Sequence, residues 1–256
     1  MVRFLEFIGG GVEDLIVQMG KILLLLVQAI QWLAVPPVRW RQIFKQMEFV
    51  GVKSVLVVLL TGAFTGMVLA LQSYIGFKKF NAENMVGAIV GLSMTRELGP
   101  VLTGIMVTAR AGSAMAAELG TMRVTEQIDA LYALATNPVR YLIVPRLVAG
   151  VLMLPILTVI SDFIGVVGGY FVGVILLGIN SVTYMQNTTT YVEMSDLVNG
   201  LIKSAFFGLI LALIGCYKGF NTEGGAEGVG RATTGAVVLS AILIIISDYF
   251  LTALMF

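Results

Sequence analysis

Residues 93–120 read SMTRELGPVLTGIMVTARAGSAMAAELG, an apolar stretch with charged residues inside it and a small residue at every fourth position. Gly104, Thr108, Gly112, Ala116 and Gly120 form this ladder. Side chains this small let one membrane helix approach the backbone of another closely. The stretch therefore predicts a membrane helix packed on several sides, with Gly104, Thr108, Gly112 and Ala116 as its packing face.

Charged residues interrupt the same helix. Arg96, Glu97 and Arg110 fall in or near hydrocarbon, and Pro100 predicts a kink between them. Ionisable groups in a membrane are costly, so they usually face a bundle interior or an aqueous cavity and mark a pathway. The alternative is that they only neutralise partners on neighbouring helices.

Composition sets the class of protein. The chain has 256 residues, of which 58% are hydrophobic and 12% charged, with a mean hydropathy of +0.95. These values are typical of a polytopic membrane protein. A net charge of +1 gives no nucleic-acid character, and the absence of histidine removes the commonest metal ligand and general base. We therefore expect no catalytic residues, no metal site, no cofactor and no disulfide, since Cys216 is the single cysteine.

The chain is predicted to be all-α, with an N-terminal interfacial or re-entrant segment in residues 1–48 and five membrane spans in residues 49–256. Residues 15–35 are apolar but interrupted by glutamines and Lys21, and their clean part is shorter than the roughly 20 residues a span needs. A full span remains the alternative for this segment. The five expected spans are residues 50–75, 85–118, 141–179, 197–217 and 232–256.

Basic residues predict the orientation. They gather before the first span, between the second and third, and between the fourth and fifth. The positive-inside rule then places these three segments in the cytoplasm and the C-terminus outside. The last of them contains glycine-rich residues 224–230, which we interpret as a flexible turn before a helix that starts near Arg231.

The cytoplasmic segment after the second span predicts a short amphipathic helix. Thr125 is a candidate N-cap, acidic and polar residues follow in the first turn, and Asn137 and Pro138 stop the helix. Such a helix, joined to long spans, has the form of a coupling element that docks into another protein. A helix lying among lipid head groups is the alternative. The expected docking residues are Glu126, Gln127, Ile128, Asp129 and Leu131.

Four ionisable residues are predicted to share one layer in the outer half of the membrane. At 1.5 Å per residue, Arg96 and Glu97 lie about 15 Å from the outer end of their span, and Lys203 and Asp248 about 10 Å from the ends of theirs. We expect Arg96 and Lys203 to attract a lipid phosphate, with Glu97 and Asp248 holding them in position. Two ion pairs that only hold the helices in register are the alternative. Asp162 belongs to this group or to a separate structural pair.

The motifs together resemble the MlaE family of ABC-transporter permeases. They are ELGPVL at 97–102, ARAGS at 109–113, AAELGTM at 116–122, EQIDAL at 126–131 and GGAEGVGRATT at 224–234. The similarity extends from about Phe44 to the C-terminus. The resemblance implies an N-terminal interfacial helix, five spans and a coupling helix over residues 126–134.

The resemblance also implies a function and partners. It implies a permease homodimer of the bacterial inner membrane, working with a cytoplasmic ATPase and a periplasmic MCE-domain protein, that moves phospholipid between inner and outer membranes. A small STAS-domain protein is a further candidate partner. The sequence itself has no Gly-x-x-x-x-Gly-Lys-Ser/Thr run, so energy from ATP would have to come from a partner chain.

Two other classes of function remain open on the sequence. An ion-gradient-driven secondary transporter of an amphiphile predicts internal repeats and broken helices that meet at the midplane, and no repeat is visible. An intramembrane enzyme needs a catalytic constellation, and scattered carboxylates without histidine do not supply one.

Overall fold

The computed structural model describes residues 2–33, 35–36 and 39–255, which form helices and no strand. The first twelve segments, in chain order, are α1 (Val2–Leu33), α2 (Trp40–Val50), η1 (Val52–Ser54), α3 (Val55–Lys78), η2 (Glu83–Met85), α4 (Val86–Ser93), η3 (Met94–Leu98), α5 (Gly99–Val107), η4 (Thr108–Gly112), α6 (Ser113–Val124), α7 (Gln127–Ala133) and η5 (Val139–Ile143). The remaining segments are α8 (Val144–Tyr170), η6 (Phe171–Leu176), α9 (Ser181–Tyr191), α10 (Met194–Phe220) and α11 (Gly225–Met255).

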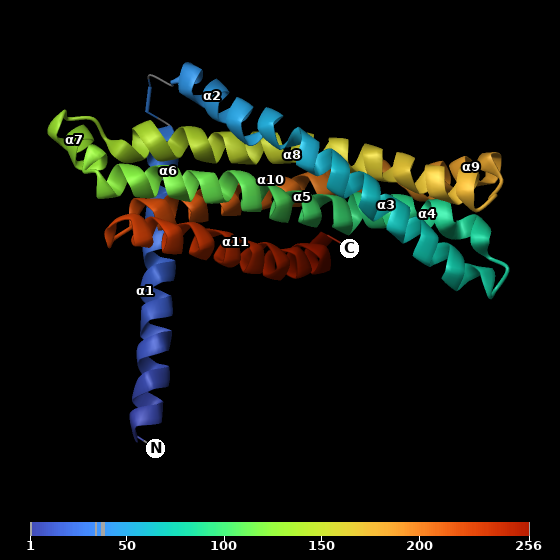
Figure 1. Ribbon diagram of the computed structural model, residues 1–256, viewed down its shortest axis with the longest axis horizontal. Coiled ribbons are helices and arrows are strands. Elements are labelled where there is room, and N and C mark those ends of the chain that lie inside the picture. Colours follow the sequence, from blue (N-terminus) through green and yellow to red (C-terminus); the bar gives the residue numbers. More distant parts are fainter. Residues whose placement is uncertain (1, 34, 37–38, 256) are drawn as a thin grey trace.

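These segments build a bundle of membrane-spanning helices. Six stretches of the described chain are long and apolar enough to cross a membrane, and five of them correspond to the predicted spans. The α3 helix, the continuous α4 to α6 rod, α8 and α10 run along the bundle in Figure 1, with α7 at one end and α9 at the other. The prediction of an all-α polytopic membrane protein is confirmed.

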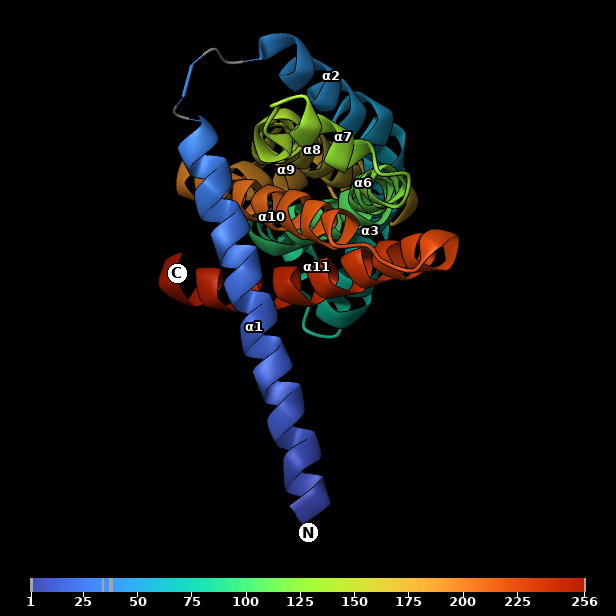
Figure 2. The same ribbon diagram turned by 90° about the vertical axis from the view of Figure 1, so that its left-hand side faces the viewer.

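The sixth stretch lies in α1, which is one unbroken helix from Val2 to Leu33. It begins earlier than the predicted apolar segment and contains no re-entrant turn. Figures 1 and 2 show α1 crossing the bundle at its α7 end instead of running parallel to it. Among the side chains of α1 that the structure describes, at residue 13 and from residue 16 on, Leu25 and Ala29 are buried against the bundle. The interfacial helix and the full span both stay predictions for this segment. The sequence also predicts that Pro36 and Pro37 end this segment; α1 ends at Leu33, before Pro36, and Pro37 lies outside the described residues.

The second span is a composite of α-helical and π-helical turns. The π-helical segments η3 and η4 separate α4, α5 and α6, and Pro100 stands at the start of α5, directly after η3. A π-helical turn is rare, and it frequently marks a functional site. The discontinuity predicted at Pro100 therefore begins in the turn before the proline.

Close glycine contacts join α3, α8 and α10. A Cβ atom on Gly66 of α3 would overlap the backbone carbonyl of Gly165 on α8, and one on Gly208 of α10 would overlap that of Gly150. Glycine is required at these crossings because the helix backbones touch. The contacts fix α8 between α3 and α10, so α8 forms the centre of the bundle.

Two local predictions differ from the structure. The glycine-rich residues 224–230 are not a turn before Arg231, because α11 already begins at Gly225, with Gly224 and Gly225 at positive φ. The polar segment before α10 contains a helix, α9, whose N-cap Asn180 accepts hydrogen bonds from the amides of Val182 and Thr183.

The second difference is at the coupling helix. Thr125 is not its N-cap, since the Thr125 hydroxyl donates to the Thr121 carbonyl and completes α6. Glu126 instead takes a left-handed conformation, φ 59°, that turns the chain from α6 into α7. A hydroxyl already engaged in the preceding helix is unable to cap the next one.

Candidate functional site

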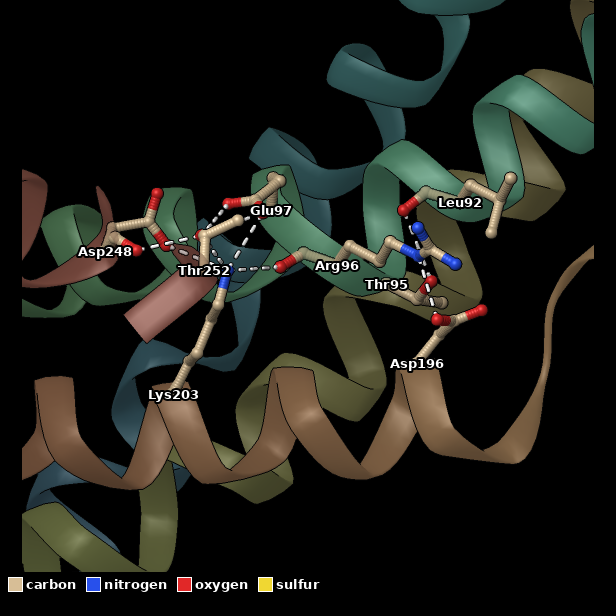
Figure 3. A network of polar contacts seen from close by, with 8 residues as sticks. All are labelled: Leu92, Thr95, Arg96, Glu97, Asp196, Lys203, Asp248 and Thr252. Carbon is tan, nitrogen blue, oxygen red and sulfur yellow. Dashed lines mark hydrogen bonds and ion pairs between the residues drawn. The ribbon is translucent and has the colours of Figure 1, made fainter. Parts of the chain in front are cut away.

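Lys203 is the centre of a polar cluster between three helices. Its side chain is fully buried, although it carries a charged ammonium. The ammonium donates to Glu97 Oε1 at 2.9 Å, to Asp248 Oδ1 at 3.2 Å and to Thr252 Oγ1 at 2.6 Å. Figure 3 shows these groups converging from η3, α10 and α11. A buried charge is tolerated when it is paired and hydrogen-bonded in this way.

The π-helical turn η3 supplies a further acceptor. The main-chain carbonyl of Arg96 lies 3.0 Å from Lys203 Nζ and accepts a hydrogen bond from it. Four residues on stands Pro100, which has no N–H to donate to this carbonyl. The proline thus leaves the Arg96 carbonyl available to the lysine.

The Arg96 side chain points away from Lys203. Its Nε donates to Asp196 Oδ1 at 2.8 Å, in the first turn of α10 (Figure 3). Asp196 is almost completely buried and also accepts from the Glu193 amide, in a capping box. This pair closes the end of α10 against η3.

The structure therefore brings together Glu97, Lys203 and Asp248 and sets the Arg96 side chain apart from them. Sequence reasoning missed two members of the site, Thr252 and Asp196. Thr252 lies one turn after Asp248 and donates to the Asp248 carbonyl or to Glu97. The sequence could have identified both residues. Thr252 shares a helix face with Asp248, and Asp196 stands three residues after Glu193, as in a capping box.

Exposure separates the roles within the cluster. The Lys203 side chain is inaccessible, whereas 39% of the Arg96 side chain and 35% of the Glu97 side chain are exposed. Two cations face three carboxylates in the combined set of Arg96, Glu97, Asp196, Lys203 and Asp248. Lys203 is placed to hold helices together, and Arg96 and Glu97 are the most exposed members of the set.

Asp162 does not join this cluster. It lies on α8, is 6% exposed and packs against Gly99, and within the described chain it makes no ion pair.

Arg110, a further charged residue of the second span, also lies outside the cluster. Its Nη1 donates to the Phe49 carbonyl and to Ser54 Oγ at 2.9 Å, and its guanidinium lies 5.0 Å from the centroid of the Phe49 ring. Arg110 thereby fixes the junction between α2 and α3.

The predicted docking residues occupy α7, at the end of the bundle. Ile128 is fully buried beneath the helix and Leu131 is partly buried, so these two anchor α7 to its own chain. Glu126, Gln127 and Asp129 are exposed, and Asp129 accepts from Arg123 at 2.7 Å. Tyr132 and Leu134, which lie within the predicted coupling helix of residues 126–134, are exposed apolar residues.

The small-residue ladder of the second span packs against α10 within the same chain. A Cβ atom on Gly104 would lie 3.4 Å from the Phe207 side chain, and one on Gly215 would lie 3.0 Å from the Gly112 carbonyl. Ala116 is contacted in the same way by Gly219. Thr108 is fully buried in this contact. The structure thus places the ladder at an intramolecular helix crossing.

Comparison with known proteins bears on this arrangement. The profile of the family described as "Permease MlaE" matches residues 43–254, which extend from within α2 to the last turn of α11. The chain belongs to the MlaE permease family. Within the described ranges of this MlaE-family permease, no group of three or more His, Cys, Asp and Glu side chains is placed to hold a metal ion.

Individual relatives of this MlaE-family permease extend the comparison. It is 51% identical over 237 residues to a "Probable ABC transporter permease protein" of Rickettsia bellii, covering 93% of this chain and 92% of that one. It is 38% identical over 261 residues to the "Intermembrane phospholipid transport system permease protein MlaE" of Haemophilus influenzae, covering 100% and 98%. It is 40% identical over 219 residues to "Protein TRIGALACTOSYLDIACYLGLYCEROL 1, chloroplastic" of Arabidopsis thaliana, covering 86% and 63%. The chain is thus a multi-pass membrane permease of the ABC-transporter type.

Proposed function

We propose that this permease moves phospholipid between the inner and outer membranes of a bacterium, driven by a separate cytoplasmic ATPase. The full-length similarity to a protein named as an intermembrane phospholipid transport permease carries the proposal. The sequence has no P-loop, so the ATPase is a second chain. A homodimer in contact with a periplasmic MCE-domain protein completes the proposed assembly, with the C-terminus in the periplasm.

The polar cluster is the proposed lipid head-group site. Arg96 and Glu97 are the exposed members, and a guanidinium suits a phosphate because it offers several N–H donors in one plane. Lys203, held by Glu97 and Asp248, sets the position of η3 and α11 behind them. The lipid chains would lie along the apolar walls between the spans.

The α7 helix is the proposed ATPase-docking element. The α4 to α6 rod connects the cluster residues on η3 to α7 at the other end of the second span (Figure 1). The Ile128 side chain fixes α7 to this rod, and the exposed residues Asp129, Tyr132 and Leu134 are available to a partner. A movement imposed on α7 would therefore reach the cluster.

The experiment is reconstitution of the tagged permease with its co-purified ATPase in vesicles that contain fluorescent phospholipid. We expect lipid transfer with ATP and none with a non-hydrolysable analogue. The variants Asp129→Arg and Leu134→Arg should lose the ATPase on purification. The matched control is the charge reversal Lys79→Glu, because Lys79 is exposed near the end of α3, away from α7. This variant should retain the ATPase. Transfer driven by an ion gradient without ATP would contradict the proposal, and so would normal ATPase recovery with both α7 variants.

A further inference from the structure

A cavity lies beside the polar cluster and is lined by none of its ionic members. Its volume is about 430 Å³, within the range of small-molecule sites, and it lies between α4, α8 and α9 at the level where α10 begins. Thr95, Val159, Asp162, Phe163, Thr188 and Val192 are among its lining residues. Phe163 is 70% exposed and Val159 is 50% exposed, so the cavity opens on the surface of the bundle that lipid covers.

Asp162 is the unexplained group in this cavity. Its residue is 6% exposed, and Oδ1 is buried without a hydrogen-bond partner in the described part of the chain. Gly99 makes room for it, since a Cβ atom at that position would overlap Oδ1. A buried carboxylate without a partner is costly, because burial removes its hydration and supplies nothing in return. The structure thus maintains an acidic group in the wall of an apolar cavity.

The other polar side chains in the wall leave only acceptors towards the cavity. The hydroxyl of Thr95 donates to the Gly91 carbonyl at 3.0 Å, that of Thr188 to the Tyr184 carbonyl at 2.9 Å and that of Thr189 to the Met185 carbonyl at 3.0 Å. A hydroxyl has one proton, so each keeps only lone pairs for a ligand. A wall of acceptors around a carboxylate is complementary to a positively charged hydrogen-bond donor.

We propose that this cavity binds a lipid with a primary ammonium in its head group, of the ethanolamine type. The ammonium donates to Asp162, and an acyl chain lies along Val159 and Phe163. A trimethylammonium head group has no N–H to donate, and an anionic head group is repelled by the carboxylate. This site is distinct from the phosphate site proposed above, and binding to it needs neither ATP nor a transport partner.

Fluorescence quenching in lipid nanodiscs tests the site on the full chain. The two natural tryptophans are replaced, Trp32→Phe and Trp40→Phe, and Phe163→Trp serves as the reporter at the cavity. A minor fraction of the lipid is brominated in an acyl chain and carries either an ethanolamine, a choline or a glycerol head group. We expect the ethanolamine lipid to bind about tenfold more tightly than the other two, as one charge-assisted hydrogen bond allows.

Two controls decide the outcome. A reporter at Leu60→Trp, exposed on α3 away from the cavity, should be quenched equally by all three lipids. Asp162→Asn keeps the shape beside Gly99 and removes the charge, and should make the three lipids equal at Phe163→Trp. Equal quenching at Phe163→Trp with Asp162 intact would overturn the proposal without any variant of the carboxylate, and a preference that survives Asp162→Asn would also overturn it.

Discussion

The Lys203 ammonium on α10 donates a 2.9 Å hydrogen bond to Glu97 Oε1 on η3, and the lysine side chain is fully buried. Replacing Lys203 with methionine keeps the length of the side chain and removes the charge. Glu97 and Asp248 would then face each other without a cation. We expect a loss of stability of about 3–5 kcal/mol, the usual effect of breaking a buried ion pair.

Thermal unfolding of the purified variant in one detergent measures this loss. The triple variant Lys203→Met, Glu97→Gln, Asp248→Asn removes the whole ionic set and should recover most of the stability, because no unpaired charge remains. A melting temperature of Lys203→Met equal to that of the wild type would show that Lys203 does not hold these helices.

The Arg96–Asp196 pair gives a second prediction. Asp196 is the side-chain partner of Arg96, so the informative charge swap is Arg96→Glu with Asp196→Arg. If Arg96 contacts lipid phosphate, the single variant Arg96→Glu loses lipid transfer, and the swap restores folding without restoring transfer. Size-exclusion profile and lipid transfer are measured in parallel. Full transfer by the swapped variant would assign the pair a purely structural role.

Glycine contacts give a third prediction. In Gly66→Ala, the new methyl group would meet the Gly165 backbone, which has no freedom to move aside. We expect a loss of about 1–3 kcal/mol from overpacking. In Gly112→Ala the nearest atom is a Thr108 methyl at 3.5 Å, an ordinary contact, so we expect little change or a gain from the better helix propensity of alanine. Thermal unfolding of the two variants side by side checks the contrast, and equal melting temperatures would refute it.

The α7 helix gives a fourth prediction. Ile128→Ala removes a fully buried side chain and should destabilise the permease by about 2–5 kcal/mol. Tyr132→Ala, at a 54% exposed position, should leave the melting temperature unchanged and reduce only the recovery of the ATPase. A Tyr132→Ala variant with full ATPase recovery would remove this residue from the proposed interface.

Much of the cluster could be predicted because depth in a membrane follows from residue counting. Glu97, Lys203 and Asp248 were expected at one level, and the structure brings them into contact. The direction of the Arg96 side chain could not be predicted, since counting assumes a uniform α-helix. The π-helical turn η3 changes which way successive residues point, and Pro100 predicts a break there without giving its form.

The helix ends were harder to predict than the spans. Gly224–Gly230 looks like a flexible loop in sequence, yet α11 starts at Gly225 because Gly224 and Gly225 make the turn at positive φ. Thr125 was a reasonable cap by composition, but its hydroxyl is used by α6. In both places the sequence pattern is compatible with two local structures, and the contacts of the folded chain select one of them.

The two π-helical turns of the second span also determine where this helix can change in length. A π-helical turn holds about one residue more than the α-helical turn that would replace it. Loss of one residue within η3 or η4 would leave an α-helix with its flanks still in phase. Loss of one residue within α5 would rotate the helix beyond it by about 100° relative to the helix before it. With Glu97 still in contact with Lys203, Arg110 would then point away from Phe49. Single-residue deletions among relatives should therefore fall in η3 or η4 and be absent from the nine residues of α5.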